Sequence, residues 1–182
     1  VTAPLDYLSG DFTWAFGLDS AALEAKFMDS RGLPWDLMAW GFTTAGQMSR
    51  ARWTAKTADH LKIEGALVAA NGGAFWIYDQ PLRSGKLVDW HMDIFADVAK
   101  FMRARQPVCQ GSASAPHVAL LHSQSHYYAN NHPEGTASLY NEGQPVRTLT
   151  GALQLLLDNG YHADVMNEDA LLRRMDAYPV IV

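Results

Sequence analysis

The sequence predicts an α/β fold built on parallel sheets and divided into two parts, and three observations support this. Short apolar runs alternate with amphipathic segments up to residue 109, the pattern of βα units. Small residues without periodicity at 110–116 interrupt that pattern, as in a linker. Beyond them the strand and helix signals resume. We therefore expect one domain over residues 1–109 and the start of another over 117–182.

The first part contains signals for three strands and three helices. Ser20, Thr57 or Asp59, and Asp89 can cap helices because their side-chain oxygens accept hydrogen bonds from free backbone N–H groups. Glycines at 32 and at 72–73 follow amphipathic stretches and mark helix ends. The expected strands are 5–8, 36–42 and 74–78, and the expected helices are 20–29, 57–70 and one that opens at Asp89.

The second part begins with an apolar strand at 117–121, followed by a long polar loop. A helix is expected over 147–159 with Gly160 after its end, then a strand at 162–166. Asn167 caps a short helix, and 179–182 forms a third strand. Three strands that alternate with two helices through short connections predict the first half of a doubly wound, flavodoxin-like sheet.

Composition narrows the possible functions. The formal net charge is −5, so the chain lacks the basic footprint of a protein that binds nucleic acid or anionic membranes. Its apolar content of 48% excludes a disordered chain. No apolar run approaches the ~20 residues of a membrane span. The single Cys109 excludes an internal disulfide but not export, so cytoplasm and periplasm both remain open. Val1 and the strand-like end suggest a piece of a longer polypeptide.

Aromatic and polar residues gather where the strands of the first part end. In parallel α/β folds these positions meet ligands. Aromatic rings stack on sugar rings, while carboxylates and amides bind hydroxyls or supply acid, base and nucleophile. No Gly-rich phosphate loop is present, and we expect no cofactor and no metal. The candidate catalytic residues are Asp11 and Asp79, and the candidate substrate-binding residues are Trp40, Trp53, Tyr78, Gln80, Trp90 and His91.

Each of these residues also has a purely structural interpretation. Asp11 can cap a loop and Asp79 can start a turn. We interpret Trp76 as core, because large aromatic residues are usually buried. Asp36 is expected to face solvent or cap a helix, and Glu64 to be an exposed charge or a member of a salt bridge.

Three histidines cluster with Glu134 in the loop after the second part's first strand. His122, His126 and His132 offer imidazole ligands, but their irregular spacing disfavours a zinc site. The serines between them lack the flanking glycines of a nucleophile elbow. Cys109 has no helix N-terminus beside it to activate the thiol and is interpreted as inert.

Three segments carry a family resemblance: 34–42 (PWDLMAWGF), 53–56 (WTAK) and 72–81 (GGAFWIYDQP). They resemble the last part of a glycoside hydrolase (β/α)₈ barrel. The resemblance is to the bacterial α-L-fucosidase-like hydrolases, which are related to the β-galactosidases that carry a trimerisation domain. Residues 117–182 are similar to the start of that trimerisation domain, which has a glutamine-amidotransferase-like fold. The order of segments, from barrel end through helix and linker to flavodoxin-like half, matches the order in these hydrolases over nearly the whole chain.

This resemblance implies that the strands at 5–11, 36–42 and 74–79 are the sixth, seventh and eighth of the barrel. The related β-galactosidases carry a nucleophilic Glu at the end of the seventh strand, whereas residues 38–42 contain no carboxylate. The nucleophile then lies on an earlier strand, or Asp11 or Asp79 has taken a catalytic role. An amidotransferase activity would need a Cys nucleophile, and 117–182 contains no Cys.

The resulting hypothesis is a part of a glycoside hydrolase that acts on an α-L-fucoside or a β-galactoside. The chain would supply one wall of the sugar pocket and part of a domain that forms a homo-oligomer. Because a barrel of this type uses about eight strands, we expect the chain alone to be inactive. The alternative is a non-catalytic module that self-associates through its flavodoxin-like half, with its aromatic residues as ordinary core.

Overall fold

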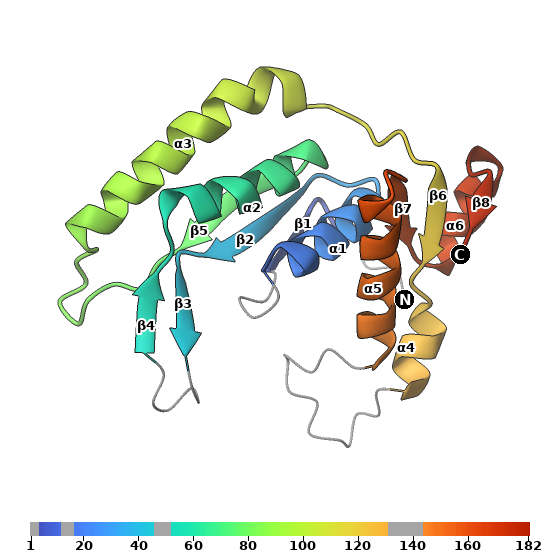
Figure 1. The fold of residues 1–182 in the computed structure, drawn as a ribbon, viewed down its shortest axis with the longest axis horizontal. Helices are drawn as coiled ribbons and strands as arrows, with labels where there is room; N and C mark the ends of the chain where they lie inside the picture. Colours follow the sequence, from blue (N-terminus) through green and yellow to red (C-terminus); the bar gives the residue numbers. More distant parts are fainter. Residues whose placement is uncertain (1–3, 12–16, 46–51, 131–143) are drawn as a thin grey trace. The chain divides into compact units, whose positions relative to one another are not determined.

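A computed structural model of the chain describes residues 4–11, 17–45, 52–130 and 144–182 (Figure 1). These residues form two compact units, and the chain passes from the first to the second between Ala113 and Ser114. Unit 2 also includes Lys26–Leu33. Among the described residues, none of the helices has the length and apolar composition that crossing a membrane requires.

Unit 1 is built on a parallel three-stranded sheet with the order β1-β2-β5. Helices α2 and α3 pack side by side, and α2 also contacts β2 and β5 (Figure 1). An antiparallel hairpin, β3-β4, follows β2. The elements are β1 (Leu8–Asp11), α1 (Gly17–Asp29), β2 (Trp35–Trp40), β3 (Phe42–Ala45), β4 (Arg52–Ala55), α2 (Ala58–Ala70), β5 (Ala74–Tyr78) and α3 (Asp89–Cys109). The end of α1, from Lys26 on, belongs to unit 2.

One face of β2 forms the core of unit 1. Trp35, Leu37 and Ala39 are buried, while the residues between them are only half-buried. Alternation of this kind arises because successive side chains of a strand point to opposite faces. Trp35 packs so closely on Gly73 that a Cβ there would lie 2.3 Å from the indole ring. Trp35 is therefore part of the core of unit 1.

Of the three helix caps expected in this part, only the one of α2 is confirmed. Helix α1 already begins at Gly17, so Ser20 lies inside it, and the N-cap of α3 is Val88, with Asp89 as the first helical residue. Thr57 is the N-cap of α2, and its side chain accepts a hydrogen bond from the His60 N–H at 3.2 Å. Gly32 and Gly72 have φ values of +72° and +86°, which a glycine adopts without steric cost, and they follow the ends of α1 and α2. Residues 74–78 form β5 as predicted.

Other boundaries differ from the expectation. The first strand starts at Leu8 instead of residue 5. The loop predicted after β2 contains the hairpin β3-β4, whose short strands lack a strong alternating signal. Helix α3 continues through Pro107 to Cys109, so that cysteine is the last residue of the helix, directly before the linker. Its final-turn proline removes one backbone donor without stopping the helix.

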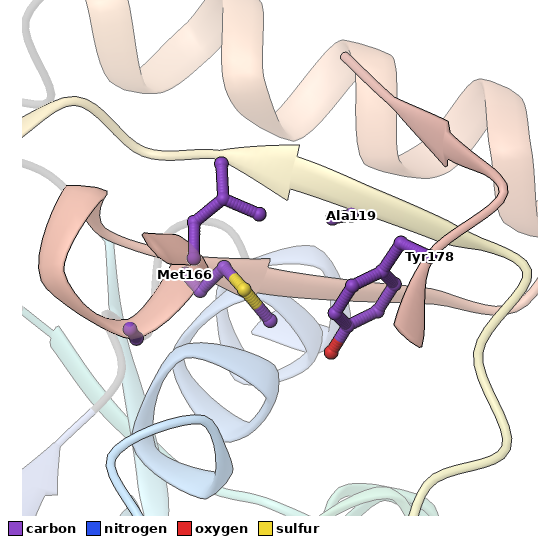
Figure 2. Packing of buried hydrophobic residues seen from close by; sticks show 5 residues of the cluster. Ala119, Met166 and Tyr178 are labelled. Carbon is purple, nitrogen blue, oxygen red and sulfur yellow. The ribbon is translucent and has the colours of Figure 1, made fainter. Parts of the chain in front are cut away.

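Unit 2 contains a second parallel sheet with the order β7-β6-β8. Its core cluster combines Ala119, Met166, Ala170, Leu171 and Tyr178, of which Figure 2 labels three. Part of the polar loop predicted after β6 is a helix, α4. The elements are β6 (Val118–Leu121), α4 (Gln124–Asn130), α5 (Gln144–Asp158), β7 (Ala163–Met166), α6 (Glu168–Arg174), the 3₁₀ turn η2 (Met175–Ala177) and β8 (Val180–Ile181).

The helix signals of unit 2 are confirmed. Asn167 is the N-cap of α6, and its side chain accepts a hydrogen bond from the Ala170 N–H at 3.1 Å. Gly160, with a φ of +75°, follows α5. The chain is therefore mixed α/β with two parallel sheets, as the sequence predicts.

Candidate functional site

The three strands of unit 1 end at one edge of their sheet. Parallel pairing places Asp11 opposite Met38 and Trp40 opposite Tyr78. Residues that follow the strands are therefore brought together at the carboxyl edge, where α/β folds bind ligands. The side chains at this edge form the candidate site.

An aromatic cluster occupies the ends of β2 and β5. The ring centroid of Trp40 lies 5.3 Å from that of Phe42 and 6.0 Å from that of Tyr78, and the other two are 5.6 Å apart. These separations are typical of tilted and edge-to-face aromatic contacts. The buried Trp40 Nε1 has no hydrogen-bond partner among the described residues. We name these three residues the aromatic cluster.

Gly41 permits the close approach of this cluster to α3. Its N–H donates to the Tyr78 carbonyl at 2.8 Å, and a Cβ at Gly41 would lie 2.8 Å from Phe95 Cζ. The backbone of β2 therefore continues past its last paired residue in direct contact with β5 and α3. The absence of a side chain at Gly41 determines the depth at which the cluster sits.

Asp79 and His91 form a pair directly beyond β5. The His91 Nδ1 lies 3.0 Å from Asp79 Oδ2 and 3.2 Å from Oδ1, and the two side chains are only 16% and 6% exposed. Trp90 contacts the imidazole edge-on, with ring centroids 4.1 Å apart. A carboxylate at Nδ1 fixes the proton there and leaves Nε2 available to exchange a proton or hydrogen bond with a ligand.

The remaining predicted site residues have looser surroundings. Asp11 and Gln80 are exposed. The side chain of Trp53 lies outside the described residues, although its backbone belongs to β4. The structure thus brings together Trp40, Tyr78, Asp79, Trp90 and His91.

Sequence reasoning missed a buried ion pair next to this edge. Lys56 Nζ lies 2.7 Å from Glu64 Oε1, with side chains 1% and 0% exposed. Of the two alternatives expected for Glu64, an exposed charge or a member of a salt bridge, the second is confirmed, and the pair is buried. The spacing of Glu64 from Leu61 and Val68, three and four residues away on the buried face of α2, is the signal that could have shown its burial.

The expectation that Trp76 is core is wrong, because its side chain is 45% exposed. Trp76 pairs in register with Met38, on the face of the sheet opposite to Leu37. Its Nε1 donates to Asp36 Oδ1 at 3.1 Å, and Ser9 Oγ donates to the same oxygen at 2.6 Å. Asp36 is therefore a hydrogen-bond acceptor on the sheet rather than a helix cap. We name these residues, Ser9, Asp36 and Trp76, the open-face trio.

A second polar group lies at the carboxyl ends of β6 and β7 in unit 2. Glu168 accepts hydrogen bonds from Ser123 Oγ at 2.6 Å and from the Gln124 N–H at 3.0 Å. These bonds, that from the Ser123 hydroxyl foremost, lower the pKa of Glu168 from 4.5 to about 2. Burial lowers the pKa of His122, which packs between Phe27 and Tyr127. The hydrogen bonds to Glu168 tie the segment after β6 to the first residue of α6.

The histidine cluster is only partly described. Within the described ranges no three His, Cys, Asp or Glu side chains are arranged to hold a metal ion. His132 and Glu134 lie outside those ranges. Cys109 is a free, half-buried thiol.

The sequence matches no protein-family model, and none of the curated proteins matches it. Two solved structures share its fold. The α-L-fucosidase isoenzyme 2 from Paenibacillus thiaminolyticus aligns with 97% of this chain and 25% of its own, with a TM-score of 0.73 and 20% identity. Gan42B, a GH42 β-galactosidase, aligns with 96% of this chain and 28% of its own, with a TM-score of 0.64 and 16% identity.

Both of these structural neighbours are glycoside hydrolases. This chain spans only about a quarter of the length of each. Identities this low show a common fold, and a fold by itself does not define a function.

Proposed function

We propose that this chain is part of a glycoside hydrolase, in which unit 1 forms one wall of a sugar pocket and unit 2 begins an oligomerisation domain. The observation that carries the proposal is the Asp79–His91 pair beside the aromatic cluster, at the carboxyl edge of a parallel sheet. The names of the two structural neighbours suggest an α-L-fucoside or a β-galactoside as substrate.

The proposal includes a closed barrel. Parallel sheets are normally covered on both faces, yet one face of β1-β2-β5 carries the open-face trio and is partly exposed. In a (β/α)₈ barrel that face is covered by side chains of the other strands, while helices cover the outer face. An arc of three barrel strands therefore explains why one face packs on α2 and the other is polar and aromatic.

The side chains at the carboxyl edge of the sheet are of the types that bind a sugar. The half-buried Trp40 and Tyr78 of the aromatic cluster and the exposed Trp90 supply apolar faces of the size of a pyranose ring, and the buried Phe42 packs against the first two. Gln80 and His91 Nε2 supply hydrogen-bonding groups for hydroxyls. A pocket with large rings and a few directed polar groups is the usual composition of a small-molecule site.

We assign different roles to the two candidate carboxylates. Asp79 is buried against His91, so it acts by orienting the imidazole, whose Nε2 then binds or protonates a sugar oxygen. Asp11 is exposed at the end of β1 and is the candidate general acid or base. The nucleophile belongs to another barrel strand, because residues 38–42 hold no carboxylate. No cofactor takes part.

Hydrolysis of p-nitrophenyl α-L-fucoside and p-nitrophenyl β-D-galactoside by the full-length polypeptide tests the proposal. We expect one of them to be cleaved. Asp11→Asn is expected to lower kcat by ~10²- to 10⁴-fold, the usual contribution of a general acid or base. Asp79→Asn should lower kcat/KM by ~10- to 100-fold, the value of a charged hydrogen bond. Asp93→Asn, an exposed residue of α3, is the matched control. Unchanged hydrolysis in both site variants would refute the assigned roles.

A specific observation supports the alternative of a self-association module. Leu172, Val180, Ile181 and Val182 of unit 2 are exposed apolar residues, and β8 is an edge strand. Sedimentation of the chain measures this property directly. A concentration-dependent increase in mass supports self-association through unit 2, and a strictly monomeric chain contradicts it.

A further inference from the structure

The Lys56–Glu64 ion pair is buried next to the candidate site without belonging to it. Both side chains are almost completely inaccessible, and Lys56 Nζ lies 2.7 Å from Glu64 Oε1. His60 Nε2 approaches the same carboxylate oxygen at 3.2 Å, and Glu64 Oε2 is buried without a hydrogen-bond partner among the described residues. The ionic contacts of Glu64 are therefore concentrated on one oxygen, between the end of the hairpin and α2.

Backbone hydrogen bonds connect this pair to the aromatic cluster. The Lys56 N–H donates to the Gly41 carbonyl at 2.9 Å, and the Gly41 N–H donates to the Tyr78 carbonyl at 2.8 Å. Gly41 lies directly between Trp40 and Phe42 in the chain. A displacement of Lys56 would therefore move the backbone that carries two of the three rings.

The cost of burying two charges argues for a role beyond stability. Removing both charges from water offsets most of their attraction, so such pairs contribute little to stability compared with apolar residues of similar size. A salt bridge does, however, require one geometry, whereas apolar side chains of similar volume pack in several. What the pair provides is a fixed position for the base of the hairpin.

We propose that Lys56 and Glu64 are positioning residues that hold the aromatic cluster in place for the sugar ring. The inference rests on the proposed function for its ligand. Neither side chain touches the substrate, since both are almost completely inaccessible. Their effect is on binding of the ring, so KM rises and kcat is unchanged when the pair is removed.

The test compares three variants of the full-length polypeptide. Glu64→Gln leaves the Lys56 ammonium buried with a neutral partner. The double variant Lys56→Met/Glu64→Leu replaces the pair by apolar residues of similar volume, a change that is neutral or stabilising in other proteins. Lys62→Met removes a surface pair on the same helix, where Lys62 Nζ lies 2.6 Å from Asp97 Oδ2, and serves as the control.

The double variant separates positioning from stability. We expect its thermal unfolding midpoint to equal that of the unmodified protein or exceed it, while its KM for the cleaved p-nitrophenyl glycoside rises about tenfold with kcat unchanged. Glu64→Gln should raise KM in the same way, and Lys62→Met should not. An unchanged KM in the double variant would overturn the proposal, because the pair would then contribute to stability alone.

Amide hydrogen exchange distinguishes this inference from the proposed function. If neither glycoside is cleaved by the unmodified protein, the proposed function is wrong, and exchange at positions 41 and 56 decides whether the pair positions the hairpin. Faster exchange at both amides in the double variant, without a lower unfolding midpoint, supports positioning. Unchanged exchange there contradicts it.

Discussion

Unit 1 and unit 2 each contain a parallel three-stranded sheet, but the two sheets are covered differently. In β2 buried and half-buried residues alternate, whereas all four residues of β7 are buried. Continuous burial is the usual state of a strand in a doubly wound sheet with helices on both faces. Alternation in β2 shows that one face of the unit 1 sheet is buried and the other is only partly covered by the described residues.

The acidic residues of the two sheets show the same contrast. Asp164 in β7 is buried and accepts hydrogen bonds from Tyr178 Oη and Ser114 Oγ, each at 2.6 Å. Among the described residues, Asp36 in β2 accepts its two hydrogen bonds at Oδ1, within the partly exposed open-face trio. The Asp164 carboxylate is therefore satisfied inside unit 2, while the Asp36 carboxylate lies on a partly exposed face that is open to further partners.

The largest expected effect concerns Asp164. Replacing it by leucine leaves the buried Tyr178 hydroxyl without its acceptor, and it also removes the partner of Ser114. We expect Asp164→Leu to lower the free energy of opening of unit 2 by ~2–3 kcal/mol. Native-state amide exchange of β6 and β7 measures this free energy. Tyr178→Phe, which removes the donor instead, should cost about 1 kcal/mol.

Replacing a glycine by alanine should change stability in opposite directions in the two units. A Cβ at Gly73 would overlap the buried Trp35 ring, so Gly73→Ala is expected to destabilise unit 1 by ~1–3 kcal/mol. Gly151 lies inside α5 with nothing within 4 Å of an added Cβ. Gly151→Ala should therefore stabilise unit 2 by ~0.5–1 kcal/mol. Amide exchange of β2 and β7 during urea unfolding measures the change in stability that each substitution causes in its own unit. Stability changes of the same sign in the two variants would contradict these packing differences.

The open-face trio should matter little to the chain as it stands. Asp36→Leu removes two hydrogen bonds, but water replaces them on an exposed face. The expected loss in the chain of residues 1–182 is below ~1 kcal/mol, much less than for Asp164→Leu. A larger loss, measured by exchange of β1 and β2 amides, would show that this face is not open.

The smallest expected effect is the pH dependence of unit 2 through Glu168. The folded-state pKa of about 2 lies below the ordinary value of 4.5, so its stabilising contribution is complete above pH 4.5. It is lost as the pH falls toward 2. Glu168→Gln should reduce this loss between pH 4.5 and 2, as followed by circular dichroism. An identical acid transition in both proteins would contradict the assignment.

The sequence predicted features that depend on neighbouring residues. Thr57 and Asn167 cap helices because their side chains reach backbone donors three residues away. Gly160 adopts the positive φ expected after a helix. The parallel order of strands and the gathering of Trp40 and Tyr78 at one edge followed from the βα pattern.

Features that depend on tertiary contacts could not be predicted in this way. The sequence indicated both Asp79 and His91 as candidate site residues. Their contact, however, joins positions twelve residues apart, across the irregular segment between β5 and α3. The exposure of Trp76 follows from which face α2 covers, and a short apolar run does not reveal that. The pairing of Glu64 with Lys56 depends on a hairpin whose strands have no distinctive pattern.

The central claim is that the first sheet is an arc of a closed barrel, and the accessibility of Trp76 tests it most directly. Hydroxyl-radical oxidation of Trp76 is measured in the full-length polypeptide and in the chain of residues 1–182, with the buried Trp35 as the internal reference. If other strands cover this face, oxidation of Trp76 in the full-length polypeptide falls to the rate of Trp35. Equal, rapid oxidation of Trp76 in both proteins would contradict the barrel.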